Sequence, residues 1–213
     1  MIKVAAYQYT PVNDTQARKA QIQNILGKAA SKHVDFLCLP EGVLTGYYAQ
    51  EELARKNSLA VEEKDFQEWL EVFRNSTATV IVGFNERDGN QIFDSAAIIE
   101  NGSLLGVQRK HYLYHNYFAS GACFSTFSSK GITFGVVICL DTNYFEPARI
   151  LALQGATIFF PLCAIKSLWI ILTQNVPNTT VSLLLELMKI VAGLFLLIGF
   201  GPKMVHQFVQ VIV

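Results

Sequence analysis

The sequence predicts an α/β protein in which helices cover sheets of mixed strand direction. A strand, a helix and a second apolar strand follow one another over residues 2–39, which is typical of parallel pairing. Turn signals at 87–90 and 101–102 then indicate hairpins, which require antiparallel neighbours. A strand, a helix and a strand return over residues 132–161. Both kinds of pairing are therefore expected in one layered fold.

The first element is a strand over residues 2–8. Asn13 and Asp14 can cap a helix that runs to about Lys32. The apolar face of this helix is expected to consist of Ala17, Ile22, Ile25, Leu26 and Ala29. The continuous apolar run Val34–Leu39 then predicts a strand that is buried on both faces.

The middle of the chain predicts a helix followed by hairpins. The helix presents aromatic and aliphatic residues at helical spacing, which are expected in the core: Phe66, Trp69, Leu70 and Phe73. A strand over 77–84 follows, and the turn signals flank a second strand over 91–99. Another strand covers 104–108, and Lys110 lies just past its end.

The last predicted unit repeats the parallel arrangement. Strands are expected at 125–127 and 132–139, a helix at 147–154 and a buried strand at 156–161. The order of elements is therefore β-α-β-α, then hairpins, then β-α-β, which favours mixed sheets.

Composition excludes some classes of partner. The 213 residues carry 17 basic and 17 acidic side chains, so nothing favours nucleic acid or an anionic membrane. The four cysteines show neither a CxxC pair nor a metal-ligand spacing, and most lie in apolar runs. Reduced thiols and an N-terminal segment that lacks the apolar stretch of a signal peptide favour a cytoplasmic setting.

Three reactive residues follow predicted strands. Cys139 ends the run 134–139, Glu41 follows 36–40, and Lys110 follows 104–108. Each has an ordinary reading, as a core thiol, a loop carboxylate and a surface cation. Open α/β sheets nevertheless gather their sites at the carboxyl ends of strands. The start of a helix after Cys139 is expected to favour its thiolate form.

The same segments resemble, in order, the motifs of the nitrilase superfamily of carbon–nitrogen hydrolases. The matching segments are Val4–Gln8, Phe36–Glu41, Arg109–Lys110 and Phe134–Asp141, and the likeness covers about residues 2–165. The resemblance implies an α-β-β-α sandwich with mixed sheets, here without the family's C-terminal strands. It also implies the homo-oligomers that intact members usually form.

The resemblance implies a reaction as well. Glu41 would be the general base, Cys139 the nucleophile and Lys110 the stabiliser of the oxyanion. A small amide or nitrile would be cleaved through a cysteine thioester, without a metal or organic cofactor. We expect the substrate to lie beside Tyr47, Tyr114, Leu140 and Asp141.

One departure from the family pattern keeps other functions open. Many members carry a second glutamate after the lysine, whereas residues 111–130 contain no acidic residue. His115 or Asn116 takes that neighbourhood, and a metal site built from His111 and His115 is not favoured. The alternatives are a non-catalytic binding protein of the same fold and an acyltransferase that uses an amine acceptor.

Residues 1–166 are expected to form the hydrolase domain, and residues 167–213 an atypical apolar tail. The tail carries only three charged side chains, Glu186, Lys189 and Lys203. One hypothesis for its origin is a shifted reading frame. A membrane anchor is the rival, but the uncharged segment 190–202 is shorter than the roughly 20 residues that a helical span needs.

Overall fold

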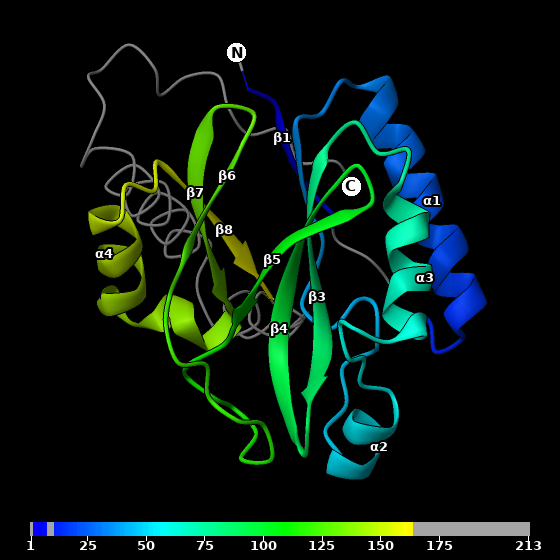
Figure 1. The fold of residues 1–213 in the computed structure, drawn as a ribbon, viewed down its shortest axis with the longest axis vertical. Helices are drawn as coiled ribbons and strands as arrows, with labels where there is room; N and C mark the ends of the chain where they lie inside the picture. Colours follow the sequence, from blue (N-terminus) through cyan, green and yellow to red (C-terminus); the bar gives the residue numbers. More distant parts are fainter. Residues whose placement is uncertain (1, 8–10, 164–213) are drawn as a thin grey trace, which may run out of the picture. The chain divides into compact units, whose positions relative to one another are not determined.

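The computed structural model describes residues 2–7 and 11–163 of the chain. The chain divides into two units, one of residues 1–163 with 209–213 and one of residues 164–208. The described residues all belong to the first unit (Figure 1). The expectations for the tail, including a shifted frame and a membrane anchor, lie outside the described residues.

The larger sheet has five strands in the order β1-β2-β3-β4-β5. Strands β1 (Val4–Ala6), β2 (Phe36–Cys38) and β3 (Thr79–Asp88) run parallel. Strands β4 (Gln91–Glu100) and β5 (Ser103–Arg109) continue it as antiparallel hairpins. The predicted mixed pairing is confirmed, and β3 extends four residues beyond the expected end at residue 84.

The smaller sheet has three strands in the order β6-β7-β8. Strand β6 (Thr126–Ser129) pairs antiparallel with β7 (Ile132–Ile138), and β7 pairs parallel with β8 (Ile158–Leu162). Helix α4 (Phe145–Leu153) supplies the crossover that a parallel pair requires. A 3₁₀ turn, η1 (Cys139–Asn143), lies between β7 and α4.

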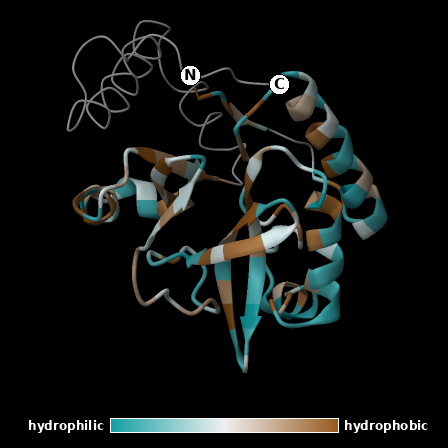
Figure 2. Ribbon diagram, turned by 45° about the horizontal axis from the view of Figure 1, so that its top comes forward, coloured by the Kyte–Doolittle hydropathy of each residue, from teal (hydrophilic) through white to brown (hydrophobic). Residues whose placement is uncertain are grey.

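Helices α1 (Thr15–Ser31) and α3 (Lys64–Phe73) cover one face of the larger sheet (Figure 1). The Asp14 side chain caps α1 by accepting from the backbone N–H of Ala17 at 2.7 Å, as expected. All four apolar residues predicted for the core of α3 are buried. The outward sides of these helices are largely hydrophilic (Figure 2). A short helix, α2 (Glu51–Lys56), was not expected.

The prediction that Ala17 belongs to the buried face of α1 is wrong. Ala17 is exposed, and the neighbouring Arg18 is buried instead. The Arg18 guanidinium donates to the carbonyl oxygens of Leu44 and Asn13, the latter at 2.9 Å. A buried charge is tolerated there because backbone oxygens replace its water.

The two sheets pack face to face through aromatic rings. Phe36 of β2 lies 5.4 Å from both Phe134 of β7 and Phe160 of β8, measured between ring centroids. Helix α4 packs on the outer face of the smaller sheet through Leu151, which contacts Val137. The layers are therefore helix, sheet, sheet and helix, as predicted. No helix among residues 2–7 and 11–163 is long and apolar enough to cross a bilayer.

Candidate active site

Lys110 lies just past β5 and is almost fully buried, with 2% of its surface exposed. Its ammonium donates to Glu41 Oε1 at 2.6 Å and to Asp94 Oδ2 at 2.9 Å. Its backbone is also held, because its N–H donates to the carbonyl of Asp94 and its carbonyl accepts from Gly121. The amine is thus fixed by strand β4 on one side and by the loop after β2 on the other.

Glu41 lies at a close approach between two backbones. Gly83 of β3 faces this loop, and a Cβ placed on it would come within 2.5 Å of the Glu41 Cα. Gly42, with φ of +66°, turns the chain immediately after the carboxylate. Glycine at these positions lets the strand and the loop meet, and Glu41 is buried as a result.

Cys139 begins the η1 turn with a left-handed backbone, at φ of +47°. Non-glycine residues adopt this region uncommonly, and such strain is concentrated at functional sites. The Thr142 hydroxyl donates to the Cys139 carbonyl at 2.7 Å and closes the turn. The residue is half-buried.

Asp141 ties the lysine segment to the cysteine turn. Its carboxylate accepts from the backbone N–H groups of Tyr112 at 2.8 Å, His111 at 3.1 Å and Ile138 at 3.4 Å. The side chain is fully buried. The predicted contact between Asp141 and substrate stays a prediction; in the structure the carboxylate is buried and bonded to these backbone N–H groups.

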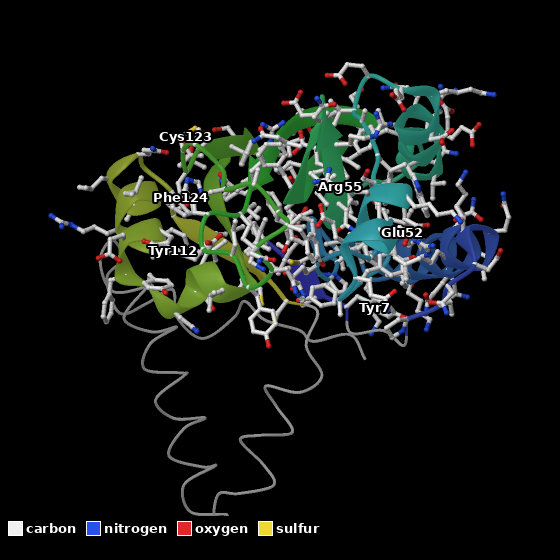
Figure 3. The ribbon with its side chains drawn as sticks, turned by 90° about the horizontal axis from the view of Figure 1, so that it is seen from below. Tyr7, Glu52, Arg55, Tyr112, Cys123 and Phe124 are labelled. Carbon is white, nitrogen blue, oxygen red and sulfur yellow. The ribbon has the colours of Figure 1, made fainter. Side chains whose placement is uncertain are left out.

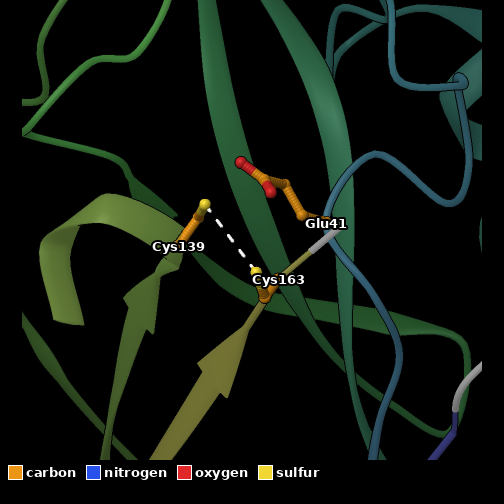
Figure 4. Close-up of side chains that lie close together, drawn as sticks. All are labelled: Glu41, Cys139 and Cys163. Carbon is orange, nitrogen blue, oxygen red and sulfur yellow. Dashed lines mark hydrogen bonds between the residues drawn. The ribbon is translucent and has the colours of Figure 1, made fainter. Parts of the chain in front are cut away.

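Acid, amine and sulfur meet at one place. A carboxylate oxygen of Glu41 and the sulfurs of Cys139 and Cys163 all lie within 4.8 Å of one another (Figure 4). Cys163 follows directly after β8, so a third strand end contributes to the site. Lys110 reaches the same group through its bond to Glu41. The structure therefore brings together all three residues that the sequence selected.

The buried charged groups shift one another's pKa values. Burial lowers the pKa of Lys110, but the adjacent carboxylates of Asp94 and Glu41 outweigh it and raise that pKa, so the amine stays protonated. Burial raises the pKa of Asp94 well above its usual range, and the nearby Glu41 raises it further. Lys110 opposes this rise. The site therefore combines a permanent cation with two carboxyl groups that compete for it.

The expectation of a stabilised thiolate at Cys139 is wrong. The hydrogen bond with Cys163 raises the pKa of Cys139, and burial and the Glu41 carboxylate raise it further. Lys110 acts in the opposite direction but is outweighed. The five-residue η1 turn does not overcome these effects. The raised pKa favours the thiol form of Cys139 at neutral pH.

Tyr47 and His115 lie at the same site. The Tyr47 hydroxyl is 3.4 Å from His115 Nε2. Burial, followed by the charge of Glu41, raises the pKa of Tyr47, and burial, followed by the charge of Lys110, lowers that of His115. Tyr114 is 70% exposed and touches His115 edge-on, and Leu140 is partly exposed.

The sequence reasoning missed Asp94 and the place of Cys163. Asp94 is the one charged residue inside the apolar run 92–99, and that isolated charge is the signal that could have found it. Cys163 ends an apolar strand in the same manner as Cys139. His111 stacks on Phe124, at 3.9 Å between ring centroids, and His115 stacks on Tyr117 at 5.1 Å. Figure 3 shows Phe124 beside Cys123.

Comparison with known proteins identifies the family of the chain. The family model for carbon-nitrogen hydrolases matches residues 3–182. A citrullinase from Francisella tularensis is 31% identical over 78% of this chain, and a nitrilase from Pyrococcus abyssi is 27% identical over 74%. The chain spans 62% and 63% of the length of these two relatives.

Solved structures share the fold. A mutant of an amidase from Nesterenkonia, of the nitrilase superfamily, matches 76% of this chain and 64% of its own with a TM-score of 0.68 and 20% identity. A glutamine-dependent NAD⁺ synthetase from Acinetobacter baumannii matches 76% of this chain and 32% of its own, with a TM-score of 0.66 and 24% identity. With the family match over most of the chain, these likenesses establish that the protein belongs to the carbon-nitrogen hydrolase family, within the nitrilase superfamily.

Proposed function

We propose that this chain hydrolyses a carbon–nitrogen bond of a small amide or nitrile through a thioester on Cys139. One observation carries the proposal. A Glu41 oxygen lies within 4.8 Å of the Cys139 sulfur, and Lys110 donates to that carboxylate at 2.6 Å. A base, a nucleophile and a fixed cation in mutual reach are the parts that acyl transfer requires.

The first half of the reaction with an amide uses the thiol as nucleophile. Glu41 removes the proton of Cys139, whose raised pKa makes a base necessary. The sulfur attacks the carbonyl carbon, and charge develops on the oxygen. The ammonium of Lys110 and the backbone N–H of Leu140 would stabilise this oxyanion. One such preorganised donor is worth about 3–4 kcal/mol.

The second half releases the products. The C–N bond breaks as the protonated Glu41 returns its proton to the leaving amine or ammonia, which leaves an acyl thioester. Glu41 then removes a proton from water, the hydroxide attacks the thioester, and the acid departs as Cys139 regains its proton. The protons balance, because Glu41 passes the proton of Cys139 to the leaving group and later passes a proton of water back to Cys139.

Asp94 supports this chemistry without touching the reacting atoms. It shares the Lys110 ammonium with Glu41, so Lys110 keeps both its charge and its direction. Asp94 also limits how strongly Lys110 can hold Glu41, which leaves the Glu41 carboxylate available as a base. We assign Asp94 as a positioning residue.

The names of the relatives support the proposed substrate class. The relatives include a nitrilase, a citrullinase and an N-carbamoylputrescine amidase from Solanum tuberosum, which is 28% identical over 78% of this chain. Their names all refer to small molecules with a carbon–nitrogen bond. Tyr47, Tyr114 and His115 would form the wall that such a substrate meets.

Ammonia release from a panel of small amides and ureido compounds tests the proposal. We expect turnover by the 213-residue chain and a loss of about 10⁴-fold or more in Cys139→Ala and in Glu41→Gln. Cys123→Ala, which alters an exposed thiol, should keep full activity. Turnover that survives in Cys139→Ala would reject the mechanism. Binding without any turnover by the unaltered chain would favour a non-catalytic binding protein.

A further inference from the structure

Cys163 is not used by the proposed reaction, yet it lies against the nucleophile. Its sulfur is 3.8 Å from that of Cys139, and a Glu41 oxygen lies within 4.8 Å of both (Figure 4). The three side chains come from the ends of β2, β7 and β8, which are held by the two sheets. The cluster is therefore built into the fold.

The spacing of the sulfurs suits one particular class of ligand. Zinc binds cysteine sulfur at about 2.3 Å in tetrahedral geometry, which separates two sulfurs on one ion by about 3.8 Å. The observed separation is 3.8 Å. A carboxylate oxygen is also a normal zinc ligand, at about 2.0–2.2 Å. A Glu41 oxygen lies within 4.8 Å of both sulfurs and is placed to supply the third ligand.

From this geometry we infer that Cys139, Cys163 and Glu41 form a binding site for one thiophilic divalent cation of the zinc and cadmium class. On binding, both thiols lose their protons to the buffer and each sulfur forms a bond to the ion. A Glu41 oxygen forms the third bond, and a water completes the tetrahedron. No electrons are transferred.

The neighbouring charges permit the ion. The Lys110 cation lies beside Glu41, but Asp94 also pairs with it, at 2.9 Å, and can balance its charge. The two thiolates and the Glu41 carboxylate would more than balance the charge of a divalent ion. Soft thiolate ligands also select zinc and cadmium over magnesium and calcium, which prefer oxygen.

Occupation would stop the proposed reaction, since the ion would take both the nucleophile and its base. The ion would thus be a reversible inhibitor and not a cofactor. Metal binding itself does not depend on turnover, because it requires only the three side chains. It can therefore be measured even if no substrate is found.

Cadmium titration of the reduced full-length chain tests the inference. We expect one Cd²⁺ per chain, with the ultraviolet charge-transfer absorption of a cadmium thiolate. Cys163→Ala should weaken binding at least 100-fold, and Glu41→Gln about tenfold. Cys123→Ala is the matched control because Cys123 is exposed and outside the cluster, and it should bind as the unaltered chain does. Unchanged absorption and affinity in Cys163→Ala would overturn the site.

Alkylation of Cys139 gives a second measurement. It uses the unaltered chain and needs no variant. Zn²⁺ should slow the reaction of Cys139 with iodoacetamide at least tenfold in the unaltered chain, located by peptide mass. Addition of a chelator should restore the rate. Equal rates with and without Zn²⁺ would reject the inference, whereas loss of turnover alone would bear only on the proposed function.

Discussion

At the scale of single residues, the proton of Cys139 is held by its neighbours. The thiol of Cys163, the burial of the turn and the charge of Glu41 all raise its pKa, and only Lys110 lowers it. A thiol in such surroundings stays protonated at neutral pH. The ionisation of Cys139 therefore depends on its neighbours Cys163 and Glu41.

The raised pKa predicts how alkylation depends on pH. Because a higher pKa leaves less thiolate at pH 7, the rate of Cys139 modification should climb through a midpoint above about 8.5, the usual cysteine value. Cys163→Ala removes the first cause of the rise and should move the midpoint down. Rates of iodoacetamide labelling, followed by peptide mass from pH 6 to pH 10, measure it.

Cys38 is an internal reference in that experiment. Burial raises its pKa to about 12, so it should stay unlabelled across the range. A Cys139 midpoint below 8.5 in the unaltered chain would contradict the expected direction.

The substitution Asp94→Asn removes the negative charge of this side chain and keeps its shape. The amide can still accept from Lys110, but one of the two countercharges of the ammonium is lost. We expect kcat to fall about tenfold or more with a smaller change in KM, and stability to fall by about 1–3 kcal/mol. Kinetics with an amide substrate and urea unfolding give the two values.

Asp88→Asn is the control for that change. Asp88 pairs with Arg109 at 2.8 Å, but its side chain is 63% exposed, so the same substitution should cost less than about 1 kcal/mol. If both variants kept normal kcat, Asp94 would have no positioning role.

At the scale of elements, the site depends on loops that are tied to one another. Asp141 joins the segment after Lys110 to the end of β7 through three backbone hydrogen bonds. Gly83 lets β3 lie directly against the loop that carries Glu41. The Asp141 contacts link the two sheets at the site, and the Gly83 contact joins two elements of the larger sheet, so a change in one element should displace a site side chain on another.

Gly83→Ala should therefore damage both stability and activity. The new Cβ would lie 2.5 Å from the Glu41 Cα and 2.6 Å from Pro40 O, and neither backbone atom can move alone. We expect a loss of about 1–3 kcal/mol, as for overpacking elsewhere, together with displacement of Glu41. Urea unfolding and amide turnover measure the two effects.

Gly27→Ala is the matched change on helix α1. A Cβ at Gly27 has nothing within 4 Å, and alanine favours the helix, so we expect a gain of about 1 kcal/mol with unchanged turnover. Equal effects of the two substitutions would mean that the close approach at Gly83 has no part in holding Glu41.

At the scale of the whole sandwich, the site exists because two sheets stack through a dry aromatic layer. Phe36, Phe134 and Phe160 form this layer, with ring centroids 5.3–5.4 Å apart. Glu41 and Lys110 follow strands of one sheet, whereas Cys139 and Cys163 follow strands of the other. The packing of the sheets therefore sets the distance between base and nucleophile.

Phe134→Ala tests this layer. Removal of a fully buried ring should reduce stability by about 3–5 kcal/mol and should lower turnover even where the protein remains folded. Phe145→Ala removes the same ring from a side chain that is 86% exposed, and it should change stability by no more than about 0.5 kcal/mol. Comparable losses in urea unfolding would contradict the assignment of the layer.

Most elements could be predicted from sequence because their signals are local. The Asp14 cap, the apolar spacing of Phe66 to Phe73 and the turns at 87–90 and 101–102 act within a few residues, and all are confirmed. Arg18 could not be placed, because its burial depends on the carbonyl of Leu44, which is distant in sequence. The short α2 and η1 elements carry too little periodicity to be recognised.

The sequence by itself determined the order of the elements and the three reactive residues at strand ends. Hydrophobic periodicity and turn-forming residues are properties of short segments, so they can be recognised without the tertiary structure. Only the tertiary structure decided that Lys110 is bonded to Asp94 as well as to Glu41, that Cys163 contacts Cys139, and that the pKa of Cys139 is raised. Such pairings join segments many residues apart, and the pKa of a side chain depends on burial and on charges that no single segment contains.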